Sequence, residues 1–482
     1  MKTGTLTRVL LAAVIAVAAV DAARAQCISN FCPPPFGSGP PSPGNPGPSN
    51  HNGLYIVGGI VIAIVAIIVG TKITAGPPSP PPSPPIPPPP GPYVPPVTQV
   101  LPPTTPGPGG GAVGPLRSGF NQPPAGEVRF VPDEVLADSP LTNIDTIAAR
   151  NDMTCPENVR IALTGRTLHR CIRNADQTVQ NMIRALSGER QIAGAQPNYL
   201  YELMQGAPGG NAEQYAPDKL EATEAHRLAT GNRVSVAVID SGVDPNHPDL
   251  AGAIAGSYEP AGTDRPHPHG TGMAGAIASR GTVQGIAPGA ELLTVRAFSA
   301  NSGSAEGTTL NIIKGLDWAA EKGARVVNMS FAGPADPRLR DALAKANAKG
   351  MVLIAAAGNA GPTSPPLYPA ADPSVIAVTA VDASDALFSG ANRGKYIAVA
   401  APGVDVLVPA PDAGYQLTTG TSVAAAEVSG VVALLIERNP RLTPKDVRRI
   451  LMRTAKHLGP RGDEREYGAG LVNALEAVTL AK

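Results

Sequence analysis

A proline-rich stretch over residues 77–124 limits how this chain can fold more than any other feature. It includes the run PPPSPPIPPPPGP, in a chain of 482 residues with 54 prolines and 53 glycines. Such a stretch has too few apolar side chains to form a core and is expected to be extended, partly as polyproline II. We therefore predict a disordered Pro/Gly-rich linker over residues 71–126 that acts as a stalk. Binding to a proline-recognition module is the alternative.

Two apolar segments precede this linker. Residues 1–25 carry Lys2 and Arg8 around the start of an apolar run and end in Ala-Arg-Ala, which is typical of a secretory signal. Residues 54–70, LYIVGGIVIAIVAIIVG, hold no charge and are just long enough to span a bilayer. We predict a transmembrane helix there, after a low-complexity segment at residues 26–53. A buried strand pair or core helix is the alternative.

These segments predict a membrane-anchored protein of the cell envelope, but they leave its topology open. Export of the N-terminus, followed by a helix that stops transfer, would leave residues 71–482 in the cytoplasm, in agreement with Lys72. A proline-rich stalk and paired cysteines suit an exported domain better. The sequence therefore supports either side of the membrane for the C-terminal part.

The four cysteines fall into two local pairs, Cys27 with Cys32 and Cys155 with Cys171. An even count after an export signal favours disulfides, with free or buried thiols as the alternative. No C-x-x-C or His/Cys cluster indicates a metal site. The 38 basic and 38 acidic residues balance, so the chain shows no electrostatic footprint for nucleic acid.

Residues 127–212 regain a globular composition and predict a small α+β domain. The sequence predicts a strand and turn at residues 127–136. Apolar residues at helical spacing predict a helix over residues 176–187. A second strand then leads to the sequence QPNYLY, which ends at Tyr201.

Three separated motifs in the remaining sequence carry reactive side chains, and none of them identifies an enzyme alone. A run of β-branched residues predicts a buried parallel strand that ends at Asp240, followed by Ser-Gly. Open α/β sheets place their ligands at this end of the strands. His269 opens a helix of small residues, and its Gly-Thr-Gly continuation favours it over His267. Ser422, in Gly-Thr-Ser-Val-Ala, also opens a helix, whose N–H groups would face a reacting carbonyl oxygen.

A fourth motif lies between His269 and Ser422. A buried strand delivers Asn359 on a glycine-flanked turn, Ala-Ala-Gly-Asn-Ala-Gly. Its side-chain amide would be a donor of the kind that completes an oxyanion hole.

Together, Asp-Ser-Gly, His-Gly-Thr-Gly, Ala-Ala-Gly-Asn and Gly-Thr-Ser-Val-Ala resemble the subtilases, in which the triad occurs in the order Asp, His, Ser. The resemblance covers roughly residues 213–480. It implies an α/β, subtilisin-like three-layer fold with a mainly parallel sheet over residues 213–482. It also implies a serine endopeptidase with Ser422 as nucleophile, His269 as general base and Asp240 as its support. Asn359 would bind the oxyanion.

The same resemblance implies the partners of this domain. The sequence before Ser330 resembles the strand beside the substrate cleft, so Ser330 and Gly333 are implied to bind a polypeptide substrate. QPNYLY resembles the end of subtilase propeptides, which implies that residues 127–212 are an intramolecular inhibitor removed by cleavage near residues 200–215. An accessory domain that is never removed is the alternative. No cofactor is required, and the family's structural calcium has no assignable ligands here.

Three positions depart from the family pattern. Val423 and Ala426 replace the usual Met and Pro after the serine, and Gly272 replaces a second histidine. None of these residues transfers a proton, although loss of the proline is expected to loosen the start of the helix. The sequence leaves two alternative functions. One is a catalytically weak, membrane-anchored surface or binding protein on a subtilase fold, and the other is an acyl hydrolase of another fold, which the motif order disfavours.

Overall fold

The computed structural model describes residues 116–482 except 175, 205–213, 264, 302–303 and 461–463. The predicted signal, low-complexity segment and transmembrane helix lie outside the described residues, as do most of the linker and the pair Cys27 and Cys32. Within the described part of the chain, no helix is long and apolar enough to cross a membrane.

A parallel sheet forms the centre of the C-terminal part. Its strands, in spatial order, are β14 (Ile397–Pro402), β13 (Val375–Val381), β12 (Val352–Ala356), β10 (Val326–Met329), β5 (Ser235–Asp240), β7 (Glu291–Arg296) and β6 (Ile254–Tyr258). Every pairing among them is parallel. All residues of β12 and β13 are buried, because helices cover both faces of a parallel sheet.

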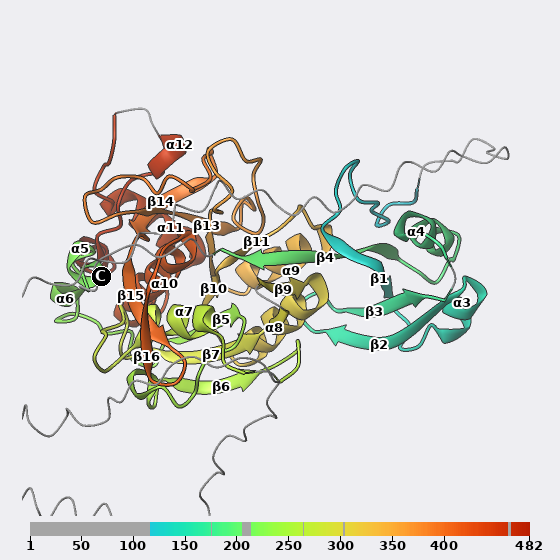
Figure 1. Cartoon of the computed structure of the whole chain (residues 1–482), viewed down its shortest axis with the longest axis horizontal. Coiled ribbons are helices and arrows are strands. Elements are labelled where there is room, and N and C mark those ends of the chain that lie inside the picture. The colour runs from blue at the N-terminus through green and yellow to red at the C-terminus, as the bar shows by residue number, and fades with distance from the viewer. Residues whose placement is uncertain (1–115, 175, 205–213, 264, 302–303, 461–463) are drawn as a thin grey trace, which may run out of the picture. The chain divides into compact units, whose positions relative to one another are not determined.

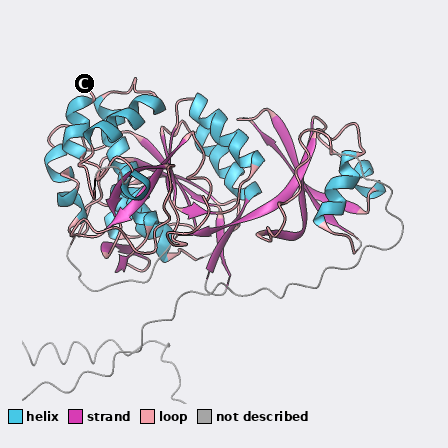
Figure 2. Ribbon diagram, turned by 90° about the horizontal axis from the view of Figure 1, so that it is seen from above, coloured by secondary structure: helices cyan, strands magenta, loops and turns pink. Residues whose placement is uncertain are grey.

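The two faces of this sheet carry different helices, as Figure 2 shows. One face packs against α7 (Pro268–Ala278), α10 (Thr421–Arg438), α11 (Pro444–Thr454) and α13 (Ala474–Leu480). The other packs against α8 (Thr309–Glu321) and α9 (Pro337–Ala348). Side chains alternate along β5, with Val236 and Val238 in the first core and Ala237 and Ile239 in the second. The predicted three-layer α/β fold with a mainly parallel sheet is confirmed.

Shorter elements complete this part. They are α5 (Ala216–Lys219), α6 (Ala222–Ala225), the 3-10 helix at Pro248–Leu250, α12 (Glu464–Tyr467), and the hairpin of β15 (Val406–Ala410) and β16 (Gly414–Thr418). Gly272 of α7 faces the hairpin, and a Cβ there would lie 2.8 Å from a methyl group of Val408. A larger side chain at this position would therefore push the hairpin away from α7.

The N-terminal part of the described chain has its own core. An antiparallel sheet of β2 (Met153–Ile161), β3 (Arg166–Arg173), β1 (Phe130–Ser139) and β4 (Gly194–Leu203) packs on α3 (Asp145–Arg150) and α4 (Val179–Ser187). Cys155 and Cys171 form a disulfide between β2 and β3. The helix expected at residues 176–187 begins at Val179, because the Thr178 side chain caps it. The hairpin β2–β3 and the helix α3 lie where the sequence predicted no element.

One long strand joins this small sheet to the C-terminal part. β4 pairs with β1 at one end and continues between β9 (Ser304–Thr308) and β11 (Phe331–Ala332), antiparallel to both. β9 in turn pairs with β8 (Phe298–Asn301). Figure 1 shows β4 extending from the small sheet toward the central layers. Residues 194–203 therefore pair both with the small sheet and with two short strands of the C-terminal part.

Candidate active site

Asp240 and His269 meet at the carboxyl end of the central sheet. Asp240 is the last residue of β5, and His269 is the second residue of α7. His269 Nδ1 lies 2.7 Å from Asp240 Oδ1, and each side chain is 1% exposed. The same carboxylate oxygen accepts hydrogen bonds from the backbone N–H and the hydroxyl of Ser241. The hydrogen bonds hold the carboxylate in one orientation, with His269 as its partner.

His267 has a different place, as the sequence suggested. It is the N-cap of α7, where its Nδ1 accepts a hydrogen bond from the backbone N–H of His269 at 3.2 Å. His247 caps the 3-10 helix in the same way, and its Nε2 lies 3.0 Å from the carbonyl oxygen of Gly414. Both side chains therefore cap the helix that follows them.

Ser422 is the second residue of α10, the helix that packs on α7 and on the sheet. The chain enters this helix through Gly420, whose φ of +145° is a conformation that glycine adopts at little cost. The helix runs without interruption through Val423 and Ala426. The side chains of Val423 and Ala426 are buried there, and the expectation that loss of the proline loosens the helix start stays a prediction.

Asn359 lies on the turn after β12 and is held by the residue that precedes the serine. Its Oδ1 accepts hydrogen bonds from the backbone N–H and the hydroxyl of Thr421 at 3.0 and 2.8 Å. The Thr421 hydroxyl accepts another from the N–H of Gly358. This arrangement fixes the amide so that its Nδ2 stays available as a donor beside the start of α10.

The chain's own residue Met204, which follows β4, occupies the site. The Ser422 hydroxyl donates to the carbonyl oxygen of Met204 and lies 3.1 Å from that of Ser330. The N–H of Met204 donates to the carbonyl of Ser330 at 3.2 Å. A peptide that adds a strand in this way is bound through its main chain, while its side chains enter pockets.

The two residues expected to contact substrate both lie along this added strand. The Ser330 hydroxyl donates to the carbonyl oxygen of Ser422 at 3.0 Å and accepts from Asn328 Nδ2. Gly333 faces the ring of Tyr201, and a Cβ built on Gly333 would lie 2.4 Å from that ring. The structure therefore places Ser422, Asn359, Ser330 and Gly333 around the last residues of the added strand, a region that we call the cleft. The pair of Asp240 and His269 lies at the start of α7, which packs against α10.

Three buried polar atoms of the predicted catalytic residues have no hydrogen-bond partner among the described residues. They are Oδ2 of Asp240, Nε2 of His269 and Nδ2 of Asn359. Buried polar groups are nearly always hydrogen-bonded, so these exceptions, at three residues that the sequence predicted to take part in catalysis, suggest a functional role. No hydrogen bond joins His269 to Ser422 in the described structure, because the Ser422 hydroxyl is directed at the two carbonyl oxygens.

Arg296 supports the site and was not predicted from the sequence. It ends β7 beside β5 and is 5% exposed. Its guanidinium donates to the carbonyl oxygens of Ser241 and Arg265 at 2.8 and 3.1 Å. A Cβ on Gly242 would lie 2.3 Å from the guanidinium carbon. The Asp-Ser-Gly motif thus needs its glycine because an arginine packs beneath the turn.

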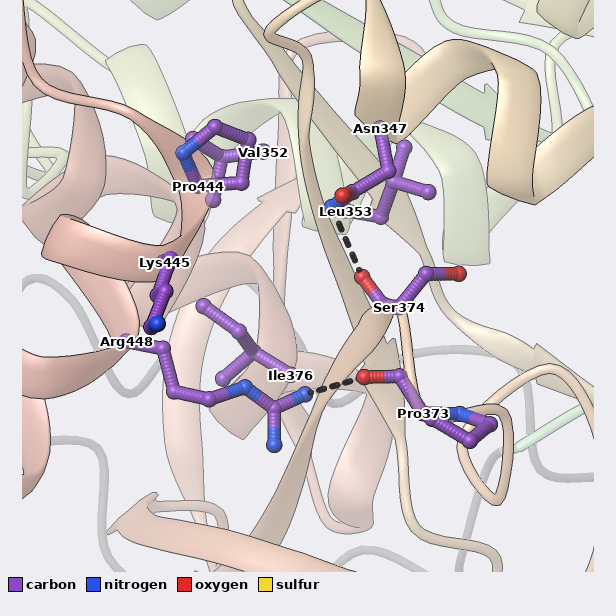
Figure 3. A pocket seen from close by; sticks show the side chains of 9 residues that line it. All are labelled: Asn347, Val352, Leu353, Pro373, Ser374, Ile376, Pro444, Lys445 and Arg448. Carbon is purple, nitrogen blue, oxygen red and sulfur yellow. Dashed lines mark hydrogen bonds between the residues drawn. The ribbon is translucent and has the colours of Figure 1, made fainter.

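The hollow in Figure 3 is separate from this cleft. It has a volume of about 180 Å³, and its lining includes Val352, Ser374 and Arg448. Val352 begins β12, whereas Asn359 follows the end of that strand, so hollow and cleft lie at opposite ends of the sheet. Arg448 crosses the hollow and donates to the carbonyl of Pro373. Within the described residues, no three His, Cys, Asp or Glu side chains gather as metal ligands.

The sequence matches the subtilase family, peptidase S8, over residues 231–470. It is 36% identical over 280 residues to thermitase from Thermoactinomyces vulgaris, a match that spans 56% of this chain and 98% of thermitase. The chain belongs to the subtilase family. It is therefore a serine-type endopeptidase with the subtilisin-like fold.

Two further relatives place this subtilase among known proteins. It is 35% identical over 311 residues to subtilisin E from Bacillus subtilis, with 62% of this chain and 78% of subtilisin E covered. Its structure resembles that of fervidolysin from Fervidobacterium pennivorans, described as a keratinolytic enzyme related to subtilisin. That match has a TM-score of 0.63 and 26% identity, and it covers 75% of this chain and 63% of fervidolysin.

Proposed function

We propose that this subtilase hydrolyses peptide bonds with Ser422 as nucleophile, His269 as general base and Asp240 as its support. The Ser422 oxygen attacks the substrate carbonyl carbon while its proton passes to His269 Nε2, the nitrogen that is otherwise unsatisfied. The hydrogen bond from Nδ1 to Asp240 holds the ring in the tautomer that accepts at Nε2. His269 then protonates the leaving amine, and water hydrolyses the acyl-enzyme.

The negative charge on the carbonyl oxygen would be stabilised by Asn359 and by the N–H of Ser422. Asn359 Nδ2 is buried and unsatisfied, and Thr421 holds its amide from the other side. A donor that is already oriented costs no reorganisation when the charge develops. Removal of one such donor lowers kcat by about 10²–10³-fold in a subtilisin, and we expect a comparable loss for Asn359→Ala.

We further propose that the first substrate is the chain itself, cleaved between Met204 and Gln205. The observation that carries this proposal is the contact between the Ser422 hydroxyl and the carbonyl oxygen of Met204. In this reaction the Met204–Gln205 bond breaks, Met204 is transferred to Ser422, and Gln205 leaves with the proton from His269. Water then releases a pro-region that ends at Met204.

The released pro-region would remain as an inhibitor, because many contacts besides β4 hold it. Asp317 of α8 accepts hydrogen bonds from the N–H groups of Ala162 and Leu163. Arg338 of α9 pairs with Asp138 at 2.6 Å, with side chains 11% and 3% exposed. These contacts place acceptors and donors of the protease part against the pro-region sheet, where they are shielded from water.

A further ion pair joins Glu157 of the pro-region to Lys314 of α8 at 2.7 Å. Burial acts to raise the pKa of Glu157, but the hydrogen bond from Lys314 and the charges of Lys314 and Arg170 outweigh it and hold the pKa below its ordinary value. The pair therefore supports docking above the ordinary carboxyl pKa, and this support is lost as the pH falls through the lowered one.

Labelling with a fluorophosphonate probe tests the triad. Wild-type protein should label after removal of the pro-region, and Ser422→Ala should not. A wild type that stays unlabelled, although folded and processed, would contradict the assignment of Ser422. The mass of the released fragments tests the cleavage site, since wild type should yield a fragment that ends at Met204 and Ser422→Ala should stay intact.

We also propose that the chain is exported and anchored in the membrane through residues 54–70. Support comes from the signal-like residues 1–25, the apolar composition of 54–70 and the Cys155–Cys171 disulfide, since disulfides persist in oxidising compartments. A reporter enzyme active only outside the cytoplasm, fused after Lys482, tests the side. Activity of the reporter places the protease outside, and its absence from an intact fusion places the protease inside.

A further inference from the structure

The side chain of Tyr201 enters a closed pocket beside the cleft. Tyr201 is the fourth residue before the proposed scissile bond, counting back from Met204, and it is completely buried. Its ring packs edge-on against Phe331 of β11, with centroids 5.8 Å apart. Gly333 leaves room for the ring, because a Cβ there would overlap it. The pocket therefore accepts an aromatic side chain only because residue 333 has no Cβ.

The end of this pocket is charged. The Tyr201 hydroxyl donates to Asp336 Oδ2 at 3.0 Å, and the hydroxyl of Thr309 donates to the same oxygen at 2.6 Å. Asp336 is 5% exposed. Its other oxygen, Oδ1, accepts from the backbone N–H groups of Arg338 and Leu339, as the N-cap of α9, and from Gln196 Nε2. The carboxylate is thus fixed in direction and buried, and all of its hydrogen bonds come from uncharged donors.

After the pro-region leaves, and Gln196 with it, a substrate would meet the part of this pocket that β9, β11 and Asp336 form. Residues 200–204 of the pro-region bind as an added strand between β9 and β11, and an extended substrate would use the same main-chain partners. Its side chain at the position of Tyr201 would face Asp336. A tyrosine restores the hydrogen bond, whereas a phenylalanine of nearly equal size leaves a buried carboxylate oxygen with one donor fewer. Such a loss is more costly for a charged group than for a neutral one.

We propose that Asp336 makes this protease selective for substrates with tyrosine at the fourth position before the scissile bond. This inference rests on the proposed function, because it takes Met204 as the residue that precedes the cleaved bond. It assigns a specificity-determining role to a side chain outside the catalytic residues. A hydrogen bond between an uncharged hydroxyl and a buried carboxylate corresponds to a preference for tyrosine over phenylalanine of about 10- to 100-fold in kcat/KM.

The test uses the processed wild-type protein and two substrates, succinyl-Tyr-Glu-Leu-Met-p-nitroanilide and its phenylalanine counterpart. Because the two differ by one oxygen atom, their ratio of kcat/KM reports the hydroxyl alone. We expect tyrosine to be preferred by at least about tenfold. A ratio within twofold of one would overturn the inference while leaving the proposed function intact. Failure to hydrolyse either substrate would overturn both.

Two variants identify the group responsible. Asp336→Ser keeps a good N-cap for α9 but removes the oxygen that faces the hydroxyl. The tyrosine preference should fall to about twofold or less, whatever happens to the absolute rates. Asp341→Ser, on the same helix but 40% exposed at its side chain, is the matched control and should keep the wild-type ratio. An undiminished preference in Asp336→Ser would overturn the assignment to Asp336, and the wild-type ratio stands as a test if that variant does not fold.

Discussion

Asp317 offers the sharpest test of how the pro-region is held. Its two carboxylate oxygens accept the N–H groups of Ala162 and Leu163 at 2.9 and 2.7 Å, and the residue is 7% exposed. Asp317→Asn has the same shape but presents an amide N–H to one of these two donors. One charge-assisted hydrogen bond is lost and two donors face each other, which costs about 2–3 kcal/mol. The inhibition constant of the pro-region should therefore rise by about 30- to 150-fold.

The assay measures inhibition of the processed protease by a wild-type pro-region of residues 116–204, with a short peptide as substrate. This segment carries its own apolar core and a disulfide, so the same folded inhibitor serves every arm. Asp341→Asn is the control, because Asp341 faces Arg166 at 3.9 Å on an exposed surface. Exposed pairs contribute about 0–1 kcal/mol, so its inhibition constant should change by about fivefold or less.

The comparison of the two variants decides the outcome. Equal inhibition constants for Asp317→Asn and Asp341→Asn would refute the reasoning. The burial of Asp317 and its two hydrogen bonds would then contribute nothing to the binding of the pro-region. Hydrolysis of the peptide in the absence of the pro-region should be similar in both variants and in wild type. This measurement separates weakened docking from damage to the active site.

Three further predictions follow from buried groups. Burial raises the pKa of Glu427 in α10 well above its ordinary value, so the native state keeps a proton that the unfolded chain releases, and stability falls as the pH rises above the ordinary value. Glu427→Gln should remove this dependence of the unfolding free energy on pH, which amounts to up to ~1.4 kcal/mol per pH unit. The urea midpoints of variant and wild type should therefore diverge between about pH 5 and pH 7. Midpoints that change in parallel with pH would contradict the prediction. Replacing Cys155 and Cys171 together by alanine opens a loop of 16 residues and should lower the free energy of unfolding of the pro-region by about 3 kcal/mol. Thermal melts of the oxidised pro-region and of the double variant measure this loss of stability. Equal melting temperatures would contradict the prediction. Gly270→Ala places a Cβ 2.4 Å from the carbonyl oxygen of Gly242. This overlap should move His269 and reduce kcat/KM by at least about tenfold. A folded variant with full activity would show that the turn at Gly242 moves to accommodate the methyl group.

Several features of the site could be predicted from sequence because local signals carry them. Asp240 ends a run of buried β-branched residues, and His269 and Ser422 each open a helix of small residues. The positions of strand ends and helix starts are properties of short segments, so the motifs could be placed before any contact was known. The three-layer arrangement follows the same logic, since fully apolar strands need helices on both faces.

Arg296 and Asp336 could not be recognised in that way. Arg296 matters because it lies beneath the turn after Asp240, which requires β7 to pair with β5. The sequence does mark Asp336 as a helix start, since it precedes Pro337. Its second role needs a hydroxyl from Tyr201, 135 residues away. The support of the turn by Arg296 and the contact of Asp336 with Tyr201 are therefore not indicated by the residues next to them in the sequence.

The sequence by itself determined which residues could carry the chemistry and what kind of fold would present them. Tertiary structure alone decided that Met204 lies against Ser422 and that the pocket beside it holds a tyrosine hydroxyl. The physical reason is that reactive motifs are encoded by local backbone geometry. Occupancy of the cleft instead depends on β4 pairing with β9 and β11 across more than a hundred residues of chain.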